Sequence, residues 1–274
     1  MAGIEAVVFD TDGVVTDTAV VHAAAWKRLF DAFLTQRSRE EGRRLEPFDE
    51  VGDYLALVDG KPRYDGVRSF LAARGIDLEG GAPTDPPGAE TVCGLGNAKD
   101  EYFHEALTAG GVRVFPDTVR LLDRLTAAGV ALAVVSASRN ARPVLSEAGV
   151  LERFAVVVDG VDSDRLGLAG KPDPALFLTA AREIGLPPAA TAVVEDAVAG
   201  VEAGRRGGFG AVIGVDRVGH AAELRAAGAD VVVPDLDAVG VEVRGTGAVV
   251  GVELTVDDDS AVGDRGASTT GDPR

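Results

Sequence analysis

The stretch "VVFDTDGVVTDT" (residues 7–18) indicates the class of fold, because an apolar run ends abruptly in a group of aspartates. Residues 6–10 are apolar up to Asp10, which is the pattern of a strand buried on both faces of a parallel sheet. Asp12 follows two positions later, and Asp17 completes a group of three carboxylates within eight positions. Such negative charge at the end of a buried strand needs a partner, so the stretch predicts a functional site there.

Short apolar runs of the same kind recur along the chain and alternate with helical patterns. The runs are rich in valine and alanine and occupy residues 131–138, 154–160, 191–197, 210–216 and 230–235. The helical patterns at 118–129 and 173–185 end at glycines, which commonly terminate helices. Strands that alternate with helices predict an α/β fold built on a doubly wound parallel sheet.

Residues 19–112 depart from this alternation. Three helical patterns, at 19–34, 64–75 and 99–111, follow one another without clear strands between them. A helical insertion after the first strand would form a cap domain over the carboxyl-terminal edge of the sheet. Within it, the stretch 77–97 is rich in glycine and proline and is predicted to be a loop.

The chain therefore divides into three predicted parts. Residues 1–18 and 113–241 form the core, and residues 19–112 form the cap. Residues 242–274 are acidic and polar, and we predict a disordered tail there. A strand pattern at 248–256 within that tail has no obvious place in the fold.

The composition excludes several classes of function. A net charge of −17, from 44 acidic and 27 basic residues, disfavours binding to nucleic acid or to anionic membranes. Cys93 is the only cysteine, which rules out an intramolecular disulfide and a thiolate metal cluster. Neither a signal peptide nor a membrane-spanning stretch is present in the pattern, so we expect a cytoplasmic protein, and a monomer.

A second group of carboxylates follows another predicted strand. Glu195 and Asp196 end the run that begins at residue 191. Ligands of an open parallel sheet bind outside the carboxyl ends of its strands, so these side chains should meet Asp10 and Asp12. Converging carboxylates repel each other without a cation, and hard oxygen ligands suit Mg²⁺. The alternative for any one strand-end aspartate is a helix cap, which is less convincing for two such groups.

Two further residues fit chemistry on a phosphate. Lys171, in "GKPDPALF" (170–177), could neutralise a carboxylate nucleophile and a phosphoryl oxygen together. Ser136, in "VVSASRN" (134–140), offers a hydroxyl followed by free backbone amides, which is a phosphate cradle. The ordinary explanations would be a solvated surface lysine and a serine in a turn.

Taken together, these segments resemble a known family. The stretches "DTDGVVTDT" (10–18), "VVSAS" (134–138), "GKPDP" (170–174) and "VVEDAVAGVEAG" (193–204) are similar, in order and spacing, to the four motifs of the haloacid dehalogenase superfamily. The resemblance implies a Rossmann-like core with a helical cap inserted after the first strand. It also implies phosphotransfer through a phosphorylated aspartate.

The resemblance assigns a role to each core residue. Asp10 would be the nucleophile and Asp12 the general acid/base, with Lys171 and Ser136 at the same phosphate. Mg²⁺ would be held by a set of oxygen ligands, namely Asp10, the backbone carbonyl of Asp12, Asp196 and Glu195. The positive site of this acidic protein would then be the cation together with Lys171.

Residues 9–27 are similar over their whole length to the beta-phosphoglucomutase subfamily. This resemblance implies a catalytic role for His22 near the hinge of the cap. Thr18 at the hinge is a further catalytic candidate, which could either contact Asp12 or cap the helix. The resemblance also implies substrate-binding residues in the core and the cap, namely Ala137, Ser138, Arg139, Asn140, Arg63 and Lys99. Arg63 lies in "VDGKPRYDGVRSFL" (58–71), and we expect it at a second, distal phosphate site. His104 and His220 have no evident partners and are predicted to be structural.

The predicted function is a Mg²⁺-dependent interconversion of beta-D-glucose 1-phosphate and glucose 6-phosphate. A sugar 1,6-bisphosphate would serve as intermediate and activator. The alternative is a sugar-phosphate phosphatase with the same nucleophile, in which a looser cap, altered by the stretch 77–97, admits water. Asp12 argues against a dehalogenase, because a halide leaves without a proton.

A phosphonatase and a non-catalytic binding protein are the remaining possibilities. A phosphonatase would need a lysine in the cap that forms a Schiff base, and Lys27, Lys61 and Lys99 are available for it. A non-catalytic phosphosugar-binding protein is disfavoured, because every catalytic position is filled.

Overall fold

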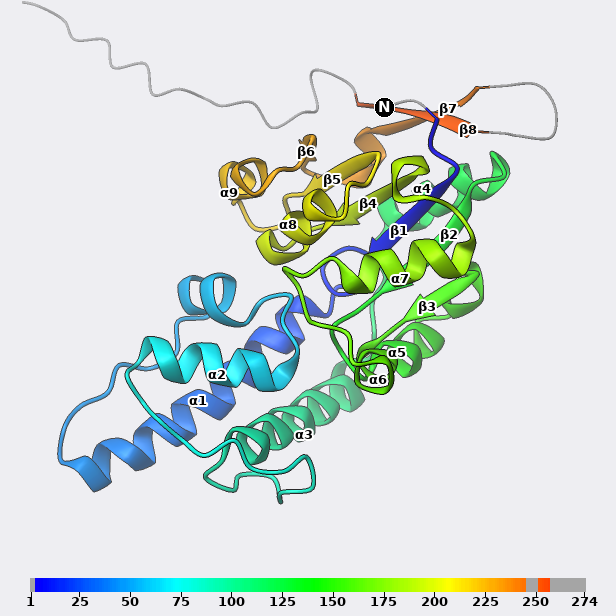
Figure 1. Ribbon diagram of the computed structural model, residues 1–274. Coiled ribbons are helices and arrows are strands. Elements are labelled where there is room, and N and C mark those ends of the chain that lie inside the picture. Colours follow the sequence, from blue (N-terminus) through cyan, green and yellow to red (C-terminus); the bar gives the residue numbers. More distant parts are fainter. Residues whose placement is uncertain (1–2, 245–250, 257–274) are drawn as a thin grey trace, which may run out of the picture.

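The computed structural model describes residues 3–244 and 251–256 (Figure 1). Its centre is a six-stranded parallel sheet with the order β3-β2-β1-β4-β5-β6. The strands are β1 (Ala6–Asp10), β2 (Ala131–Val135), β3 (Val156–Val158), β4 (Thr191–Glu195), β5 (Ala211–Val215) and β6 (Val231–Val233). The strand order reverses at β1, which lies between β2 and β4. The doubly wound α/β fold is confirmed, and its crevice falls at the ends of β1 and β4.

Helices cover both faces of the sheet, as the alternation of strand side chains requires. In β1, Val7 and Phe9 enter one buried apolar cluster and Val8 enters the other. The first cluster packs against α4 (Pro116–Ala127) and α5 (Ala141–Glu147), and the second against α7 (Ala175–Ile184), α8 (Val198–Arg206) and α9 (Ala221–Ala227). The core holds β1 by pairing and by packing on both sides, so Asp10 has a fixed position.

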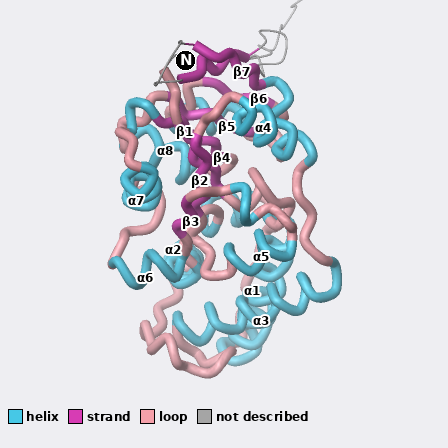
Figure 2. Tube along the Cα trace, turned by 90° about the vertical axis from the view of Figure 1, so that its right-hand side faces the viewer, coloured by secondary structure: helices cyan, strands magenta, loops and turns pink. Residues whose placement is uncertain are grey.

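The segment between β1 and α4 is helical and lies beyond the carboxyl-terminal edge of the sheet (Figures 1 and 2). It contains α1 (Ala19–Glu41), the π-helical turn η1 (Tyr54–Val58), α2 (Arg63–Ala73) and α3 (Val92–Gly110). These elements share an apolar cluster of their own, which includes Trp26, Phe30 and Phe70. The predicted helical cap after the first strand is therefore confirmed, and its boundaries at 19 and 112 stay predictions.

The predicted loop 77–97 is wrong in its last third, because α3 begins at Val92. The Thr91 side chain caps this helix by accepting a hydrogen bond from the Gly94 amide at 3.0 Å. A Cβ atom on Gly94 would lie 2.4 Å from the Ala89 carbonyl oxygen, and one on Gly96 would lie 2.6 Å from the Tyr64 ring. These glycines serve close packing inside a helix, although their abundance is typical of a loop.

The predicted disordered tail 242–274 is also wrong in part. Strands β7 (Val239–Arg244) and β8 (Gly251–Val256) pair antiparallel, and the strand pattern at 248–256 thereby finds its partner. Burial gives the physical reason, because Val252 and Leu254 enter the core cluster and Val252 exchanges backbone hydrogen bonds with Ile4. The rest of the predicted tail lies outside the described residues.

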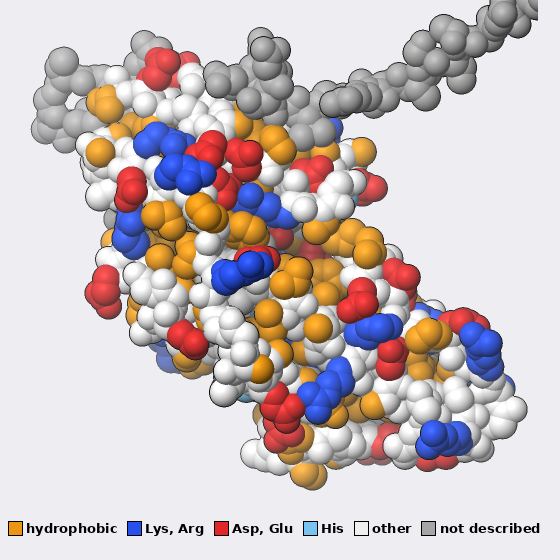
Figure 3. Space-filling model, turned by 180° about the vertical axis from the view of Figure 1, so that it is seen from behind, with side chains coloured by type: hydrophobic (Ala, Val, Ile, Leu, Met, Phe, Trp, Pro, Cys, Tyr) orange, Lys and Arg blue, Asp and Glu red, His pale blue; other side chains and the backbone are white. Residues whose placement is uncertain are grey.

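The remaining elements are short connections. They are α6 (Gly160–Leu166) and the 3₁₀ turns Leu151–Arg153, Pro188–Ala190 and Leu236–Ala238. No helix among the described residues has the length and apolarity needed to cross a membrane. On the face drawn in Figure 3, basic side chains mostly lie beside acidic ones.

Candidate active site

Lys171 joins the carboxylates of two neighbouring strands. Its ammonium donates to Oδ1 of Asp10, at the end of β1, and to Oε1 of Glu195, at the end of β4. All three side chains are buried. Burial alone would lower the pKa of Lys171, but the two carboxylates outweigh it and raise that pKa, so the ammonium keeps its proton. Burial raises the pKa of Asp10, and Lys171 opposes that rise.

Two glycines let the carboxylates of β4 approach the backbone. A Cβ atom on Gly13 would lie 1.8 Å from Oδ2 of Asp196, and one on Gly200 would lie 1.7 Å from Oε1 of Glu195. The second oxygen of Glu195 accepts a hydrogen bond from the Ala197 amide at 2.7 Å. Glu195 is thus fully engaged by the protein, whereas Asp196 lies against Gly13 in the loop after β1. The arrangement supports Glu195 as the anchor of Lys171 more than as a metal ligand.

The donor set at this edge fits a magnesium ion. The described residues contain no cluster of three or more His, Cys, Asp or Glu side chains arranged for a metal. Mg²⁺ does not need one, since it commonly takes one or two carboxylates and completes its shell with water and substrate phosphate. Asp10 and Asp196 are buried here, and Lys171 is the cation that balances Asp10. Burial raises the pKa of Asp196, and the charges of neighbouring carboxylates raise it further.

Asp12 is held as a carboxylate by groups from the core and the cap. Oδ1 accepts a hydrogen bond from the Thr18 hydroxyl at 2.5 Å, and Oδ2 accepts one from the Ser136 hydroxyl at 3.4 Å. Nε2 of His22 lies 3.3 Å from Oδ1, at ion-pair distance but without hydrogen-bond alignment. Burial raises the pKa of Asp12, but His22 and Thr18 outweigh it and hold that pKa at about 2.

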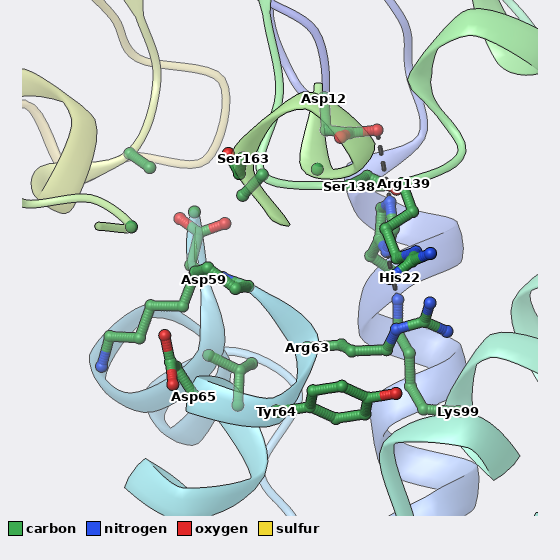
Figure 4. Close-up of a pocket in the computed structure, with 18 of the residues that line it drawn as sticks. Asp12, His22, Asp59, Arg63, Tyr64, Asp65, Lys99, Ser138, Arg139 and Ser163 are labelled. Atoms are coloured by element: carbon green, nitrogen blue, oxygen red, sulfur yellow. Dashed lines mark hydrogen bonds and ion pairs between the residues drawn. The ribbon is translucent and has the colours of Figure 1, made fainter. Parts of the chain in front are cut away.

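His22 on α1 contacts Lys99 on α3, so two cap helices meet at Asp12 (Figure 4). The His22 ring stacks on Phe103 with centroids 4.1 Å apart, and the Lys99 ammonium lies 5.2 Å from the Trp26 ring centroid. Burial lowers the pKa of Lys99 to about 7. Burial and the Lys99 charge also lower the pKa of His22, so the pair does not carry two positive charges at neutral pH.

The predicted distal phosphate site is brought together around a carboxylate. Nη1 of Arg63 lies 2.6 Å from Oδ2 of Asp100, and the Asn140 side-chain amide donates to Oδ1 of Asp100 at 2.8 Å. Arg139 pairs instead with Asp164 near the surface. A phosphate would therefore compete with Asp100 for Arg63 and Asn140.

A pocket of about 580 Å³ separates the cap from the core, within the size range of small-molecule sites. The predicted site residues that line it are Asp10, Asp12, His22, Arg63, Lys99, Ala137, Ser138, Arg139 and Asp196. The others lie behind this lining and bond to residues of it, namely Thr18, Ser136, Lys171, Asn140 and Glu195. Ser136 faces Asp12, and its hydroxyl accepts a hydrogen bond from the Ser138 amide at 3.0 Å.

Sequence reasoning missed three residues around this site. Asp59 and Tyr54 both line the pocket. Asp59 lies in the quoted stretch 58–71, where the resemblance assigns a role only to Arg63. His220, predicted to be structural without a partner, lies 2.8 Å through Nε2 from the backbone oxygen of Asp196. No sequence signal pointed to His220 beyond its place after a predicted strand.

Comparison with known proteins points to one family of enzymes. The model of the haloacid dehalogenase-like hydrolase family matches residues 4–208. A beta-phosphoglucomutase of Mycobacterium tuberculosis is 51% identical over 237 residues, covering 85% of this chain and 90% of that protein. The beta-phosphoglucomutase of Bacillus subtilis is 31% identical, covering 76% of this chain and 82% of that protein.

A solved structure supports the fold. The beta-phosphoglucomutase of Clostridium difficile superposes with a TM-score of 0.65 at 24% identity, covering 85% of this chain and 92% of that one. At this identity the likeness concerns the fold alone. The arrangement of cap and core is therefore shared with a solved enzyme structure.

Proposed function

Because the chain belongs to the haloacid dehalogenase-like hydrolase family, we propose that it is a Mg²⁺-dependent sugar-phosphate mutase of the beta-phosphoglucomutase type. It would interconvert beta-D-glucose 1-phosphate and glucose 6-phosphate through the 1,6-bisphosphate. The identity of 51% with a mycobacterial beta-phosphoglucomutase supports the reaction type. The monomeric state and cytoplasmic location stay predictions from the sequence.

In the proposed reaction, Asp10 attacks the phosphorus of a bisphosphate and becomes an aspartyl-phosphate. Asp12 protonates the sugar oxygen that leaves and later takes the proton from the other sugar hydroxyl. Lys171 stays charged beside Asp10 and balances the phosphoryl oxygens. Asp10, Asp196 and the Asp12 carbonyl would hold Mg²⁺, which supplies further charge neutralisation on the phosphate.

The single observation that carries the proposal is the contact of the cap with the acid/base residue. His22 and Lys99 both come from the cap, and His22 lies 3.3 Å from Asp12. A cap that moves away would take the basic groups of His22 and Lys99 with it, and this would alter the proton affinity of Asp12. In the closed arrangement Asp12 is a carboxylate, the form that takes the proton from an attacking sugar hydroxyl, and the cap above it would exclude water, as a mutase requires.

The phosphatase alternative keeps one supporting observation. Asp100 engages Arg63 and Asn140, so a negative charge stands where a mutase would bind the distal phosphate. Should that pairing persist with substrate bound, the second phosphate would be held poorly. Water would then replace the sugar as phosphoryl acceptor.

Phosphorus NMR tests the proposal. The protein is mixed with Mg²⁺, beta-glucose 1-phosphate and a trace of the 1,6-bisphosphate. Conversion to glucose 6-phosphate is the expected result. Stoichiometric release of inorganic phosphate would replace the mutase with the phosphatase.

A further inference from the structure

The turn between η1 and α2 seats the cap directly on the core. A Cβ atom on Gly60 would lie 3.2 Å from the Ala197 side chain, which follows Asp196 in the core. A Cβ atom on Gly170, just before Lys171, would lie 2.6 Å from the Pro62 ring. The turn therefore touches the core beside two residues of the active site.

This seat carries a carboxylate into the pocket that is lined by the proposed metal ligands. Asp59 precedes Gly60 and lines the pocket together with Asp10 and Asp196. In Figure 4 its side chain projects from the cap loop toward the core loops. Burial raises the pKa of Asp196, and the charge of Asp59 raises it further.

The core side offers Asp59 little positive charge. The groups that act on it from there are Glu195, Asp196, His220 and Lys171. Lys171 is already shared by Asp10 and Glu195, so its ammonium is not free to pair with a carboxylate from the cap. Asp59 therefore adds negative charge to an edge that already has an excess.

We propose that Asp59 is a positioning residue that couples the cap to the cation, so that bound Mg²⁺ holds the cap closed and the closed cap tightens Mg²⁺ binding. The inference rests on the proposed function in that it uses the same metal site. Without a cation, the closed cap brings one more negative charge to this edge. With a cation, the same charge becomes attractive.

Thermodynamic linkage gives the size and the reciprocity of the effect. If the closed cap raises Mg²⁺ affinity by some factor, Mg²⁺ must favour closure by the same factor. Coupling between two sites is commonly on the order of tenfold, which is measurable by titration. Removing the charge of Asp59 should weaken Mg²⁺ binding and should also relieve repulsion in the metal-free protein.

The test uses Asp59→Asn in the full chain and MgCl₂ alone as the probe. Isothermal titration calorimetry should show Mg²⁺ affinity reduced about tenfold relative to the wild type. The rise in melting temperature on adding Mg²⁺ should shrink, because the variant gains less binding free energy. X-ray scattering should show Mg²⁺-induced compaction in the wild type and less of it in the variant.

Asp65→Asn is the matched control, since Asp65 lies on the same cap segment and also lines the pocket. Its carboxylate pairs with Arg68 at 2.8 Å and is half exposed. This control removes the same charge, so we expect Mg²⁺ affinity to stay within about twofold of the wild type, within the error of additivity for separate sites.

A second variant keeps the test decisive if Asp59→Asn folds poorly. Gly170→Ala should push Pro62 away and weaken Mg²⁺ binding by the same route, and adding Asp59→Asn to it should cost little more. If the wild type binds Mg²⁺ and Asp59→Asn binds it equally well, the inference is overturned and the proposed function is not. Wild-type protein that binds no Mg²⁺ would overturn the metal dependence of the proposed function, and the inference with it.

Discussion

Nζ of Lys99, on α3, contacts Nδ1 of His22, on α1, in the interior of the cap beside the acid/base residue Asp12. Two basic groups in contact repel each other when both are charged, and burial adds to that cost. The protein therefore keeps two basic groups in contact where cap and core meet, and at neutral pH they do not both carry a charge. Such a pair is best explained by a role in the reaction.

Lys99→Met should stabilise the protein and impair it as an enzyme. Burial lowers the pKa of Lys99 to about 7 from 10.5, so the unfolded chain binds this proton more tightly than the folded one. The contribution of Lys99 to stability therefore rises with pH between about 7 and 10 and is least favourable below pH 7. We expect urea titration near pH 6.5 to show a free energy of unfolding about 1–3 kcal/mol higher for the variant than for the wild type. The variant should also lose the dependence of stability on pH between about 7 and 10.

Turnover of the same variant should fall roughly 10- to 100-fold, because Asp12 loses a cap group that orients its partner His22. The pKa of His22 should rise, since the Lys99 charge no longer lowers it. A histidine titration by NMR checks this directly. An unchanged His22 titration with unchanged turnover would remove Lys99 from the acid/base group.

Asp10→Asn should abolish phosphoryl transfer by at least about 10⁴-fold, because the amide cannot form the acyl-phosphate. Mass spectrometry after mixing with a sugar bisphosphate should show an added phosphoryl group on the wild type and none on the variant. Asp17→Asn is a matched control in the same loop, since Asp17 pairs with the exposed Arg113 at 2.5 Å. Phosphorylation of Asp10→Asn would mean that another residue is the nucleophile.

Arg63→Ala should lower kcat/KM for the sugar phosphate by about 100-fold, through loss of a partly buried charge-assisted contact to the distal phosphate. Hydrolysis of a small aryl phosphate, which has no distal group, should change less than about threefold. Arg68→Ala on the same helix serves as the control, because Arg68 pairs with Asp65. Equal losses on both substrates would place Arg63 outside the distal site.

Gly170→Ala should shift the enzyme from sugar toward water as acceptor. The added methyl group would lie 2.6 Å from the Pro62 ring, so the cap turn must move away from the core. We expect the ratio of phosphate release to sugar conversion to rise severalfold in phosphorus NMR. Gly110→Ala is the control, because a Cβ atom there meets open space. An unchanged ratio would show that this contact does not seal the pocket.

The core of the site was predictable from the sequence because topology alone brings it together. Asp10 and Glu195 end two strands that are neighbours in any sheet of this winding, and Lys171 begins the turn before α7. Parallel register then fixes their separation within a few ångströms. Neither side-chain packing nor helix placement needs to be known for that step.

The cap contacts were not predictable in the same way. The pairing of Arg63 with Asp100 depends on how α2 and α3 pack, and that packing depends on the close approach at Gly96 and Tyr64. Periodicity identifies a helix but not the neighbour it packs against. Asp59 was missed for the same reason, because its role depends on where a turn meets the core.

Two backbone hydrogen bonds join Ile4 and Val252, which lie near the two ends of the described chain. The ribosome therefore makes one of these residues early and the other late. Strand β1 also lacks its neighbour β4 until ~180 further residues have been added, which takes on the order of ten to forty seconds at common synthesis rates. During that interval the helical segment after β1 can form from local contacts, while the strand that carries Asp10 waits unpaired on one side. The nascent chain would thus form its cap helices before the strand that carries Asp10 is paired on both sides.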